Sequence, residues 1–305
     1  MRRVLHIGKF YPPYKGGMET HLQQLCRATS KELEVEVIVS NTDRHAEIDY
    51  DGAVRIQRIG TLAQVASACL CPSMISAIRR TKADVVHLHS PNPTAVLSYL
   101  ASGHHGRLVV THHSDIIRQR LLKFGYEPFL RRLMARADGI ICFSPNYLES
   151  SATLSQHRAK CRVIPHGIDM EPFEQRDKMR IAAIRQKFGD SLVVAVGRLV
   201  YYKGFDVLIR ALRDTNATLL IIGTGPLLRT LQQLAQDTGV SERVHFLGEL
   251  EEIASYYQAA RVFAFPSTAR SEAFGIAQLE SMACGTPVIN TQLDSGVPFV
   301  SLHDV

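Results

Sequence analysis

Two glutamates that lie eight residues apart near the end of the chain could do sugar chemistry. Glu272 lies in a loop before a predicted helix, and Glu280 lies two turns inside that helix. Eight residues at 3.6 per turn return to within about 80°, so both carboxylates face roughly one side. Carboxylates accept hydrogen bonds from paired hydroxyls, which makes ribose and hexose rings suitable ligands. Two surface glutamates alone would mean nothing, but Phe274-Gly275-Ile276 and Gly285-Thr286-Pro287 make the pattern specific.

A basic pair follows a short apolar strand in the same half of the chain. Arg198 and Lys203 lie five residues apart in the glycine-bounded loop 197–204. A guanidinium fork and a lysine point charge at this spacing can close on the oxygens of a diphosphate. The alternative is a solvated basic loop without a ligand. Gly223 begins another strand-to-helix turn, Gly-Thr-Gly-Pro, which by itself is a weak indication.

Paired glycines, Gly16 and Gly17, follow the first predicted strand. At a strand-to-helix turn such glycines let backbone amides approach an anion at the helix N-terminus. The alternative is an ordinary turn that needs a positive φ angle. The segment lacks both the Gly-x-Gly-x-x-Gly pattern of dinucleotide sites and the lysine of a phosphate-binding P-loop.

Histidine is frequent in the first half of the chain, which raises the question of a metal site. Neighbouring side chains on a strand point to opposite faces, so we expect mostly structural or hydrogen-bonding roles. The residues concerned are His87, His89, His104, His105, His112 and His113. His113 is the best candidate for chemistry because it follows a strand and begins a polar His-Ser-Asp loop. Sequence spacing alone hardly decides whether His112 or His113 has this role.

The composition describes a globular chain with room for two domains. The chain has 305 residues, 46% of them hydrophobic and 21% charged, and no run of the roughly 18–20 apolar residues that a membrane helix needs. Lys plus Arg number 35 against 29 for Asp plus Glu, an excess of six that suits phosphates or an anionic lipid surface. Nucleic acid is a poor candidate, because no aromatic and basic platform accompanies the excess. Six cysteines without Cys-x-x-Cys pairs favour reduced, cytosolic thiols.

The elements that must position these residues alternate along the whole chain, as in two doubly wound parallel sheets. We predict a first domain over residues 1–168 and a second over 169–305, with a crossing near 170–180. The predicted strands are 4–8, 34–40, 54–59, 84–89, 108–112, 139–144, 192–196, 218–222, 243–247, 262–265 and 287–291, and the predicted helices are 18–30, 62–80, 93–102, 116–136, 205–213, 226–238, 252–260 and 276–284. Parallel sheets bind ligands at the carboxyl ends of their strands, so a cleft between the domains is the expected site.

These motifs, in this order, resemble glycosyltransferase family 4, whose members are retaining enzymes with the GT-B fold. The family's glutamate, seven residues, glutamate signature matches at Glu272 and Glu280. Further matches are Gly-Arg-Leu-x-x-x-Lys-Gly at 197–204, Gly-x-Gly-Pro at 223–226, Pro-His-Gly-Ile-Asp at 165–169, Gly-Gly-x-Glu at 16–19 and Thr-His-His-Ser-Asp at 111–115. The resemblance covers nearly the whole chain and implies an acceptor-binding first domain and a nucleotide-sugar-binding second domain.

The resemblance also implies roles for single residues. Lys203 and its partner arginine would hold the donor diphosphate, Glu280 the ribose and Glu272 the transferred sugar, while His113 would lie beneath the anomeric centre. The complete set is His113 and Glu272 as catalytic residues, and Gly16, Gly17, Arg198, Lys203, Gly223, Phe274, Gly275, Ile276 and Glu280 as donor-binding residues. No metal or other cofactor is expected, because arginine and lysine supply the positive charge.

The implied activity is retaining transfer of a hexosyl unit, with mannose as the first choice, from a GDP- or UDP-linked sugar. The acceptor would be a saccharide or lipid-linked saccharide in polysaccharide or O-antigen synthesis. Two alternatives stay open: a sugar-nucleotide hydrolase or epimerase of the same fold, and a nucleotide-sugar-binding remnant without turnover. Product analysis with and without acceptor separates them.

The stretch 116–136 concentrates basic residues among apolar ones. It predicts peripheral contact with an anionic membrane, at the cytoplasmic face of the plasma membrane, and the alternative is a core-facing helix with a solvated basic back. Chains of the resembling family continue beyond the segment that matches 290–300. We therefore expect an incomplete second domain, short by about two strand-helix units.

Overall fold

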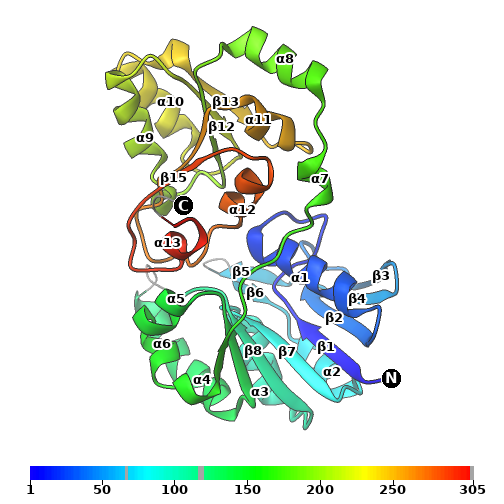
Figure 1. Ribbon diagram of the computed structural model, residues 1–305. Coiled ribbons are helices and arrows are strands. Elements are labelled where there is room, and N and C mark those ends of the chain that lie inside the picture. The colour runs from blue at the N-terminus through cyan, green and yellow to red at the C-terminus, as the bar shows by residue number, and fades with distance from the viewer. Residues whose placement is uncertain (66–67, 116–119, 303–305) are drawn as a thin grey trace. The chain divides into compact units, whose positions relative to one another are not determined.

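The computed structural model describes residues 1–65, 68–115 and 120–302. The chain divides into two compact units, Met1–His166 and Gly167–Val305, whereas the sequence placed the boundary after residue 168. Each unit is an α/β domain built on its own mainly parallel sheet (Figure 1).

The first unit contains an eight-stranded sheet in the order β10-β9-β8-β7-β1-β2-β4-β3. Every pairing in it is parallel except that of β3 with β4. The strands are β1 (Arg3–Ile7), β2 (Glu34–Ser40), β3 (Glu47–Asp51), β4 (Val54–Ile59), β7 (Val85–Ser90), β8 (Arg107–His112), β9 (Gly139–Cys142) and β10 (Cys161–Val163). The helices are α1 (Gly17–Thr29), α2 (Ser73–Arg80), α3 (Pro93–Ser102), α4 (Arg120–Arg136), α5 (Pro145–Ser150) and α6 (Ala152–Ser155), with a 3₁₀ turn η1 (Arg158–Lys160).

Local sequence explains both the apolar strands and the helix ends of this unit. Val86 and Leu88 of β7 are fully buried, as strands covered by helices on both faces should be. Helix α3 begins where the Asn92 side chain accepts a hydrogen bond from the Ala95 amide at 3.2 Å, and it ends at Gly103 with a φ of 69°. Such caps satisfy backbone groups that the helix itself leaves unpaired.

Two segments of the first unit differ from the prediction. The predicted helix 62–80 is wrong: its first part forms a hairpin of β5 (Ala63–Val65) and β6 (Ala68–Leu70), and only α2 is helical. Pro72 stands at the N-cap of α2, where proline starts a helix rather than continuing one. Strand β3 was not predicted because its side chains are mostly exposed and polar. The Asp51-Gly52 turn that joins it to β4, with a φ of 61° at Gly52, is the hairpin signal that could have found it.

The second unit contains an all-parallel five-stranded sheet in the order β13-β12-β11-β14-β15. The strands are β11 (Leu192–Val196), β12 (Thr218–Ile222), β13 (Val244–Gly248), β14 (Val262–Phe265) and β15 (Val288–Asn290). The helices are α7 (Glu171–Glu174), α8 (Lys178–Phe188), α9 (Phe205–Ala211), α10 (Leu228–Asp237), α11 (Ala254–Ala259), α12 (Ile276–Ala283) and α13 (Val297–Val300), with 3₁₀ turns η2 (Tyr201–Lys203), η3 (Leu212–Asp214) and η4 (Ser241–Arg243). Strands β11, β12 and β14 have the predicted bounds, whereas α7 and the first residues of α8 lie in the segment predicted as a crossing.

Alternation along the strands of the second unit builds one core on each face of its sheet. Leu220 and Ile222 of β12 pack in the cluster that contains Tyr257 of α11. Leu219 and Ile221 of the same strand pack in the opposite cluster, with residues of α9 and α10 (Figure 1). The sheet is therefore held between two helical layers, and its strand ends are fixed points for the loops that follow them.

All six cysteines are buried and free, which agrees with the reduced thiols expected from the sequence. Of the helices that the structure describes, none has both the length and the apolar character needed to cross a bilayer.

Candidate active site

The loops that follow β11, β12 and β14 lie against one another at neighbouring strand ends of the second unit. A Cβ atom on Gly223 would lie 2.2 Å from the carbonyl oxygen of Gly197, and Gly223 has a φ of 135°. A Cβ atom on Gly204, with a φ of 66°, would lie 1.9 Å from the oxygen of Pro266. The Thr268 amide donates to the Tyr202 carbonyl at 2.8 Å. Glycine is thus required at positions 204 and 223, because another backbone segment approaches closely at each of them.

Lys203 and Glu272 come together in these loops. Lys203 Nζ lies 2.5 Å from Glu272 Oε2, and the side chains are only 14% and 12% exposed. The ammonium also lies 4.9 Å from the centre of the Phe265 ring, and the Ser267 hydroxyl donates to Glu272 at 3.3 Å. The sequence assigned Lys203 to the diphosphate and Glu272 to the sugar. In the structure these two residues form one largely buried ion pair.

Arg198 is exposed at the edge of the same group, and no described residue forms a hydrogen bond or an ion pair with its guanidinium. Its charge still acts on the site. Burial raises the pKa of the Tyr202 hydroxyl, Glu272 raises it further, and the positive charges of Lys203 and Arg198 act in the opposite direction. The Tyr202 hydroxyl is thus within electrostatic reach of Lys203, Arg198 and Glu272.

Glu280 lies deeper, on the second turn of α12. The Tyr257 hydroxyl donates to Glu280 Oε2 at 3.0 Å. Burial raises the pKa of the Glu280 carboxyl, while Tyr257 and the charge of Lys203 lower it. Sequence reasoning missed Tyr257, because it belongs to α11 and only the fold brings it to Glu280.

The start of α12 is fixed by glycine and by a buried amide. A Cβ atom on Gly275, with a φ of 90°, would lie 2.6 Å from the Phe265 ring. Gln278, fully buried, donates to the Phe274 carbonyl at 3.0 Å, and Ile276 is the first residue of the helix. Sequence reasoning did not single out Gln278. Its hydrogen bond holds the backbone of the predicted donor-binding segment 274–276 in place.

Gly16 and Gly17 lie in the first unit, where Gly16 is the N-cap of α1. The φ of Gly16 is 173°, which is extended backbone, so the alternative of a turn that needs positive φ is wrong for this residue. A Cβ atom on Gly16 would instead lie 2.3 Å from the carboxylate of buried Glu19. Around Gly17, by contrast, no described atom other than those of its chain neighbours and of the helix backbone lies within 4 Å of such a Cβ position.

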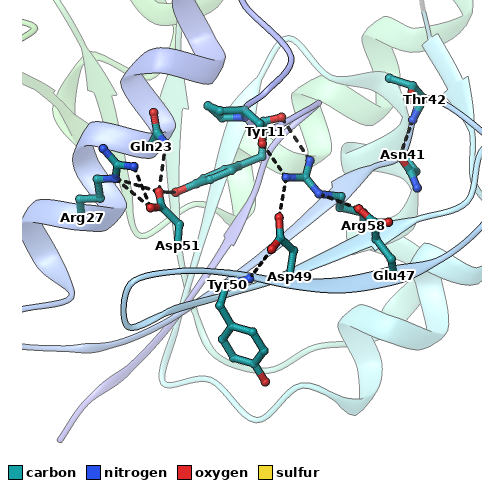
Figure 2. A network of polar contacts seen from close by, with 11 residues as sticks. Tyr11, Gln23, Arg27, Asn41, Thr42, Glu47, Asp49, Tyr50, Asp51 and Arg58 are labelled. Atoms are coloured by element: carbon teal, nitrogen blue, oxygen red, sulfur yellow. Dashed lines mark hydrogen bonds and ion pairs between the residues drawn. The ribbon is translucent and has the colours of Figure 1, made fainter.

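A polar network from the β3–β4 hairpin holds the chain just before these glycines (Figure 2). Asp51 accepts hydrogen bonds from the Tyr11 hydroxyl at 2.9 Å and from Gln23 and Arg27 of α1. Buried Arg58 donates to the backbone carbonyls of Tyr11 at 3.2 Å and Pro12 at 2.5 Å, and it pairs with Asp49 and Glu47. The hairpin thus sets the course of the loop that leads to the N-terminus of α1. The residues of this network are Tyr11, Pro12, Gln23, Arg27, Glu47, Asp49, Asp51 and Arg58.

His113 and His112 have different surroundings. His112 Nε2 lies 3.0 Å from Asp115, which also accepts a hydrogen bond from Ser151. His113 is buried, with its Nε2 3.1 Å from Nδ1 of His89 and its ring 5.3 Å from that of His21. The structure thus separates two residues that the sequence could barely distinguish.

Strand alternation does not keep all of these histidines apart. His87 and His89 are two residues apart on β7 and therefore share a face. His6 of the neighbouring strand β1 joins them, with ring centres 4.8 Å from His87 and 5.6 Å from His89. The sequence signal that could have found this group is two histidines spaced by two residues on one strand, together with a histidine at the paired position of the adjacent strand.

The second unit thus presents two carboxylates, a buried lysine, an exposed arginine and three loops whose backbones touch. Cations at strand ends are suited to phosphate oxygens, and ionised carboxylates are suited to sugar hydroxyls. The first unit presents a helix N-terminus with an unobstructed glycine and a buried histidine. The metal-ligating potential of the first unit is confined, among the described residues, to its histidines.

Comparison with known families identifies both halves of the chain. The family model described as Glycosyltransferase Family 4 matches residues 15–172, and the model described as Glycosyl transferases group 1 matches residues 177–304. The chain is 36% identical to the D-rhamnosyltransferase WbpZ of Pseudomonas aeruginosa, covering 99% of this chain and 80% of that protein. It is 34% identical to the O-antigen chain mannosyltransferase C of Escherichia coli, covering 99% and 83%.

Solved structures show the same fold at low identity. Sucrose-phosphate synthase from Thermosynechococcus elongatus aligns with a TM-score of 0.80 and 21% identity, covering 98% of this chain and 83% of that one. Anabaena HepE in complex with UDP and glucose aligns with a TM-score of 0.78 and 19% identity, covering 100% and 84%.

Proposed function

We propose a function from the premise that this chain belongs to glycosyltransferase family 4, among the group 1 glycosyltransferases, and has their GT-B fold. The proposed reaction is transfer of a mannosyl or similar hexosyl unit from a GDP-linked sugar to a saccharide acceptor, with retention of anomeric configuration. Relatives support this choice: they are named as a D-rhamnosyltransferase, an O-antigen mannosyltransferase and, at 30% identity, a GDP-mannose-dependent mannosyltransferase. A UDP-linked donor is the competing choice, because HepE was solved with UDP-glucose.

The observation that carries the proposal is the buried ion pair of Lys203 and Glu272 with Arg198 beside it. On donor binding, diphosphate oxygens replace the carboxylate as the partner of Lys203, and Arg198 adds a second positive charge. Glu272 then accepts hydrogen bonds from the hydroxyls of the sugar, and Glu280 from those of the ribose. Lys203 and Glu272 each exchange one partner for another, so neither is left buried and unpaired.

In the transfer step the bond between the anomeric carbon and the diphosphate oxygen breaks, and the acceptor oxygen bonds to that carbon from the same face. The acceptor proton passes to the departing diphosphate. Lys203 and Arg198 stabilise the negative charge that develops there, in surroundings where charge interactions are stronger than in water. This account needs no metal ion, so treatment with a chelator should not lower the transfer rate.

The experiment that tests the proposed function is product analysis by NMR with each donor, with and without a saccharide acceptor. The transferase account predicts an α-linked product from an α-linked donor only when acceptor is present. Free sugar at equal rates with and without acceptor would indicate a hydrolase, an altered sugar still attached to nucleotide would indicate an epimerase, and donor binding without any product would indicate a remnant.

Helix α4 supports a further part of the proposal, contact with an anionic membrane where lipid-linked acceptors would be. It buries Leu130 and Leu133 and exposes Arg131, Arg132 and Phe129, the last by 44%. This division also suits a helix with a solvated basic back. The first four residues of the predicted stretch, 116–119, lie outside the described residues. Flotation with vesicles in which about one third of the lipid is anionic tests the contact. The double substitution Arg131→Glu with Arg132→Glu should abolish the binding to these vesicles.

A further inference from the structure

Six histidines of the first unit gather into one group, which we call the histidine cluster: His6, His21, His87, His89, His113 and His166. They come from β1, β7, α1, the end of β8 and the segment after β10, so the fold and not the local sequence assembles them. Within the cluster, two sets of three offer nitrogen atoms that all lie within 4.8 Å of one another. The sets are His6 with His87 and His89, and His21 with His89 and His113.

One of the spacings between these nitrogens already matches that of a metal site. Nδ1 of His89 and Nε2 of His113 are 3.1 Å apart. Four ligands at 2.0–2.1 Å around a tetrahedral zinc ion are separated from one another by about 3.3 Å. The nitrogens of the three rings all lie within 4.8 Å of one another, so the rings must turn and the wider separations must shorten by up to about 1.5 Å to bring three lone pairs onto a single ion.

The rings are in the chemical state that a metal requires. Burial lowers the pKa of His21 to about 4 and that of His89 and His113 well below the ordinary value, so all three are neutral near pH 7. No carboxylate belongs to the set. Imidazole ligands without oxygen donors favour zinc, cobalt, nickel and copper over magnesium and calcium.

Access separates the two sets. His6, His87 and His89 are all buried, whereas His21 is only half-buried and offers a path for an ion from solvent. His166, also half-buried, adds a nitrogen 2.9 Å from Nδ1 of His21. The outer set thus contains one ring that solvent reaches, and an ion held by its three histidines would have a fourth position for water or for His166.

We propose that His21, His89 and His113 form a site for a first-row transition-metal ion such as Zn²⁺, and that its occupation inhibits the enzyme. The metal site stands on its own geometry. Inhibition rests on the proposed function and on the role that the family resemblance implies for His113, beneath the anomeric centre. An ion there would occupy the lone pair of the His113 imidazole and would keep that ring from contacting a substrate.

The test of the site uses Co²⁺ with untagged protein and no sugar nucleotide. Tetrahedral or five-coordinate cobalt absorbs in the visible range, so a saturable spectrum reports an ordered site. The wild type should give a one-to-one titration, and Zn²⁺ should displace the cobalt while Mg²⁺ should not. His21→Gln should weaken the apparent affinity by about tenfold or more, since a ligand contributes at least as much as an outer-shell partner.

His45→Gln is the matched control, because His45 is 90% exposed and belongs to neither set. It should titrate as the wild type does, and circular dichroism should show both variants folded. Absence of a saturable cobalt spectrum, or equal affinities for wild type and His21→Gln, would overturn the site. Zinc that binds but leaves transfer unchanged would overturn the inhibition. Failure of every donor to react would count against the proposed function alone, since the titration contains no donor.

Discussion

Gly16 and Gly17 are adjacent residues with opposite reasons for being glycine. A Cβ atom on Gly16 would collide with the carboxylate of buried Glu19, whereas one on Gly17 meets no described atom. Gly17→Ala should therefore leave the fold intact, and it should even raise the free energy of unfolding slightly, by up to about 1 kcal/mol, because alanine restricts the unfolded chain. If Gly17 admits the donor diphosphate, the added methyl group should raise the KM for the sugar nucleotide by about tenfold or more, about 1.4 kcal/mol.

Thermal unfolding and initial rates measure the two effects separately. Gly16→Ala serves as the comparison, because it should lower the unfolding midpoint by forcing Glu19 from its buried place. A Gly17→Ala protein with normal stability and a normal KM would remove this residue from the donor site.

Tyr257 sets the ionisation of Glu280, and this gives a pH-dependent prediction. Because its hydroxyl lowers the pKa of Glu280 against the effect of burial, Tyr257→Phe should raise that pKa. A carboxyl with a raised pKa takes up a proton at higher pH and then binds ribose hydroxyls less well. The acid limb of donor affinity against pH should therefore move to higher pH in Tyr257→Phe.

Isothermal titration between pH 5 and pH 8 measures this shift. Tyr256→Phe is the matched control, since Tyr256 is the neighbouring residue of the same helix and no described group bonds to its hydroxyl. An acid limb that does not move in Tyr257→Phe would show that Glu280 does not govern donor binding.

At the scale of elements, the β3–β4 hairpin fixes the loop that begins α1. Arg58 donates to two backbone carbonyls of this loop and is itself buried. Arg58→Met should leave those carbonyls unpaired and reduce the free energy of unfolding by about 1–3 kcal/mol. Urea denaturation measures it. Glu47→Gln, which removes only the half-exposed partner of Arg58, should cost less than about 1 kcal/mol. Equal effects of the two changes would mean that the hairpin does not hold the loop.

The elements that the sequence predicted well are those whose patterns are complete within a short window. Strands β11, β12 and β14 are short, mostly apolar runs that end just before Gly197, Gly223 and Pro266, and their limits were predicted to the residue. The segment 62–80 was misassigned because apolar residues in a short hairpin and in a helix look alike when periodicity is the only signal. Strand β3 was missed because an exposed edge strand carries no alternation.

The candidate site divides in the same way. Lys203, Glu272 and Glu280 were found because loops after parallel strands converge at one edge, and the structure brings the three together. Tyr257 was missed because it lies on another helix, α11, and reaches Glu280 only in the folded chain. Gln278 was missed because its buried side chain acts on the backbone at Phe274 and not on a ligand. The histidine cluster was missed because alternation was applied to neighbours in sequence and not to neighbours on adjacent strands.

At the scale of the whole molecule, the histidine cluster makes the first unit sensitive to acid. Burial lowers the pKa of His6 to about 3, while an unfolded histidine has its ordinary value near 6.5. Below pH 6.5 the unfolded chain therefore binds a proton that the folded chain refuses. Stability is complete above that pH and falls as pH decreases toward the folded pKa, by about 1.4 kcal/mol per pH unit for His6, which is 2% exposed.

Thermal unfolding between pH 7.5 and pH 4.5 should show the first unit melting earlier with each step below pH 6.5. His6→Gln should flatten this dependence, and His45→Gln should not, because His45 is exposed. A first unit whose midpoint is constant over this range would mean that the cluster is not buried as neutral imidazoles.

The central claim is that the charged loops of the second unit bind the diphosphate of a sugar nucleotide. Calorimetric titration tests it most directly. The proteins compared are wild type, Lys203→Ala and Lys187→Ala, each titrated with GDP-mannose, UDP-glucose and an ADP-sugar. Lys187 is the matched control, since its ammonium also lies over an aromatic ring, 5.0 Å from the centre of Phe188. The account predicts that GDP-mannose binds to the wild type and to Lys187→Ala alike, and about tenfold to a hundredfold more weakly to Lys203→Ala, as loss of a charge-assisted hydrogen bond requires. Equal binding by Lys203→Ala and wild type, or no binding of any sugar nucleotide to the wild type, would contradict it.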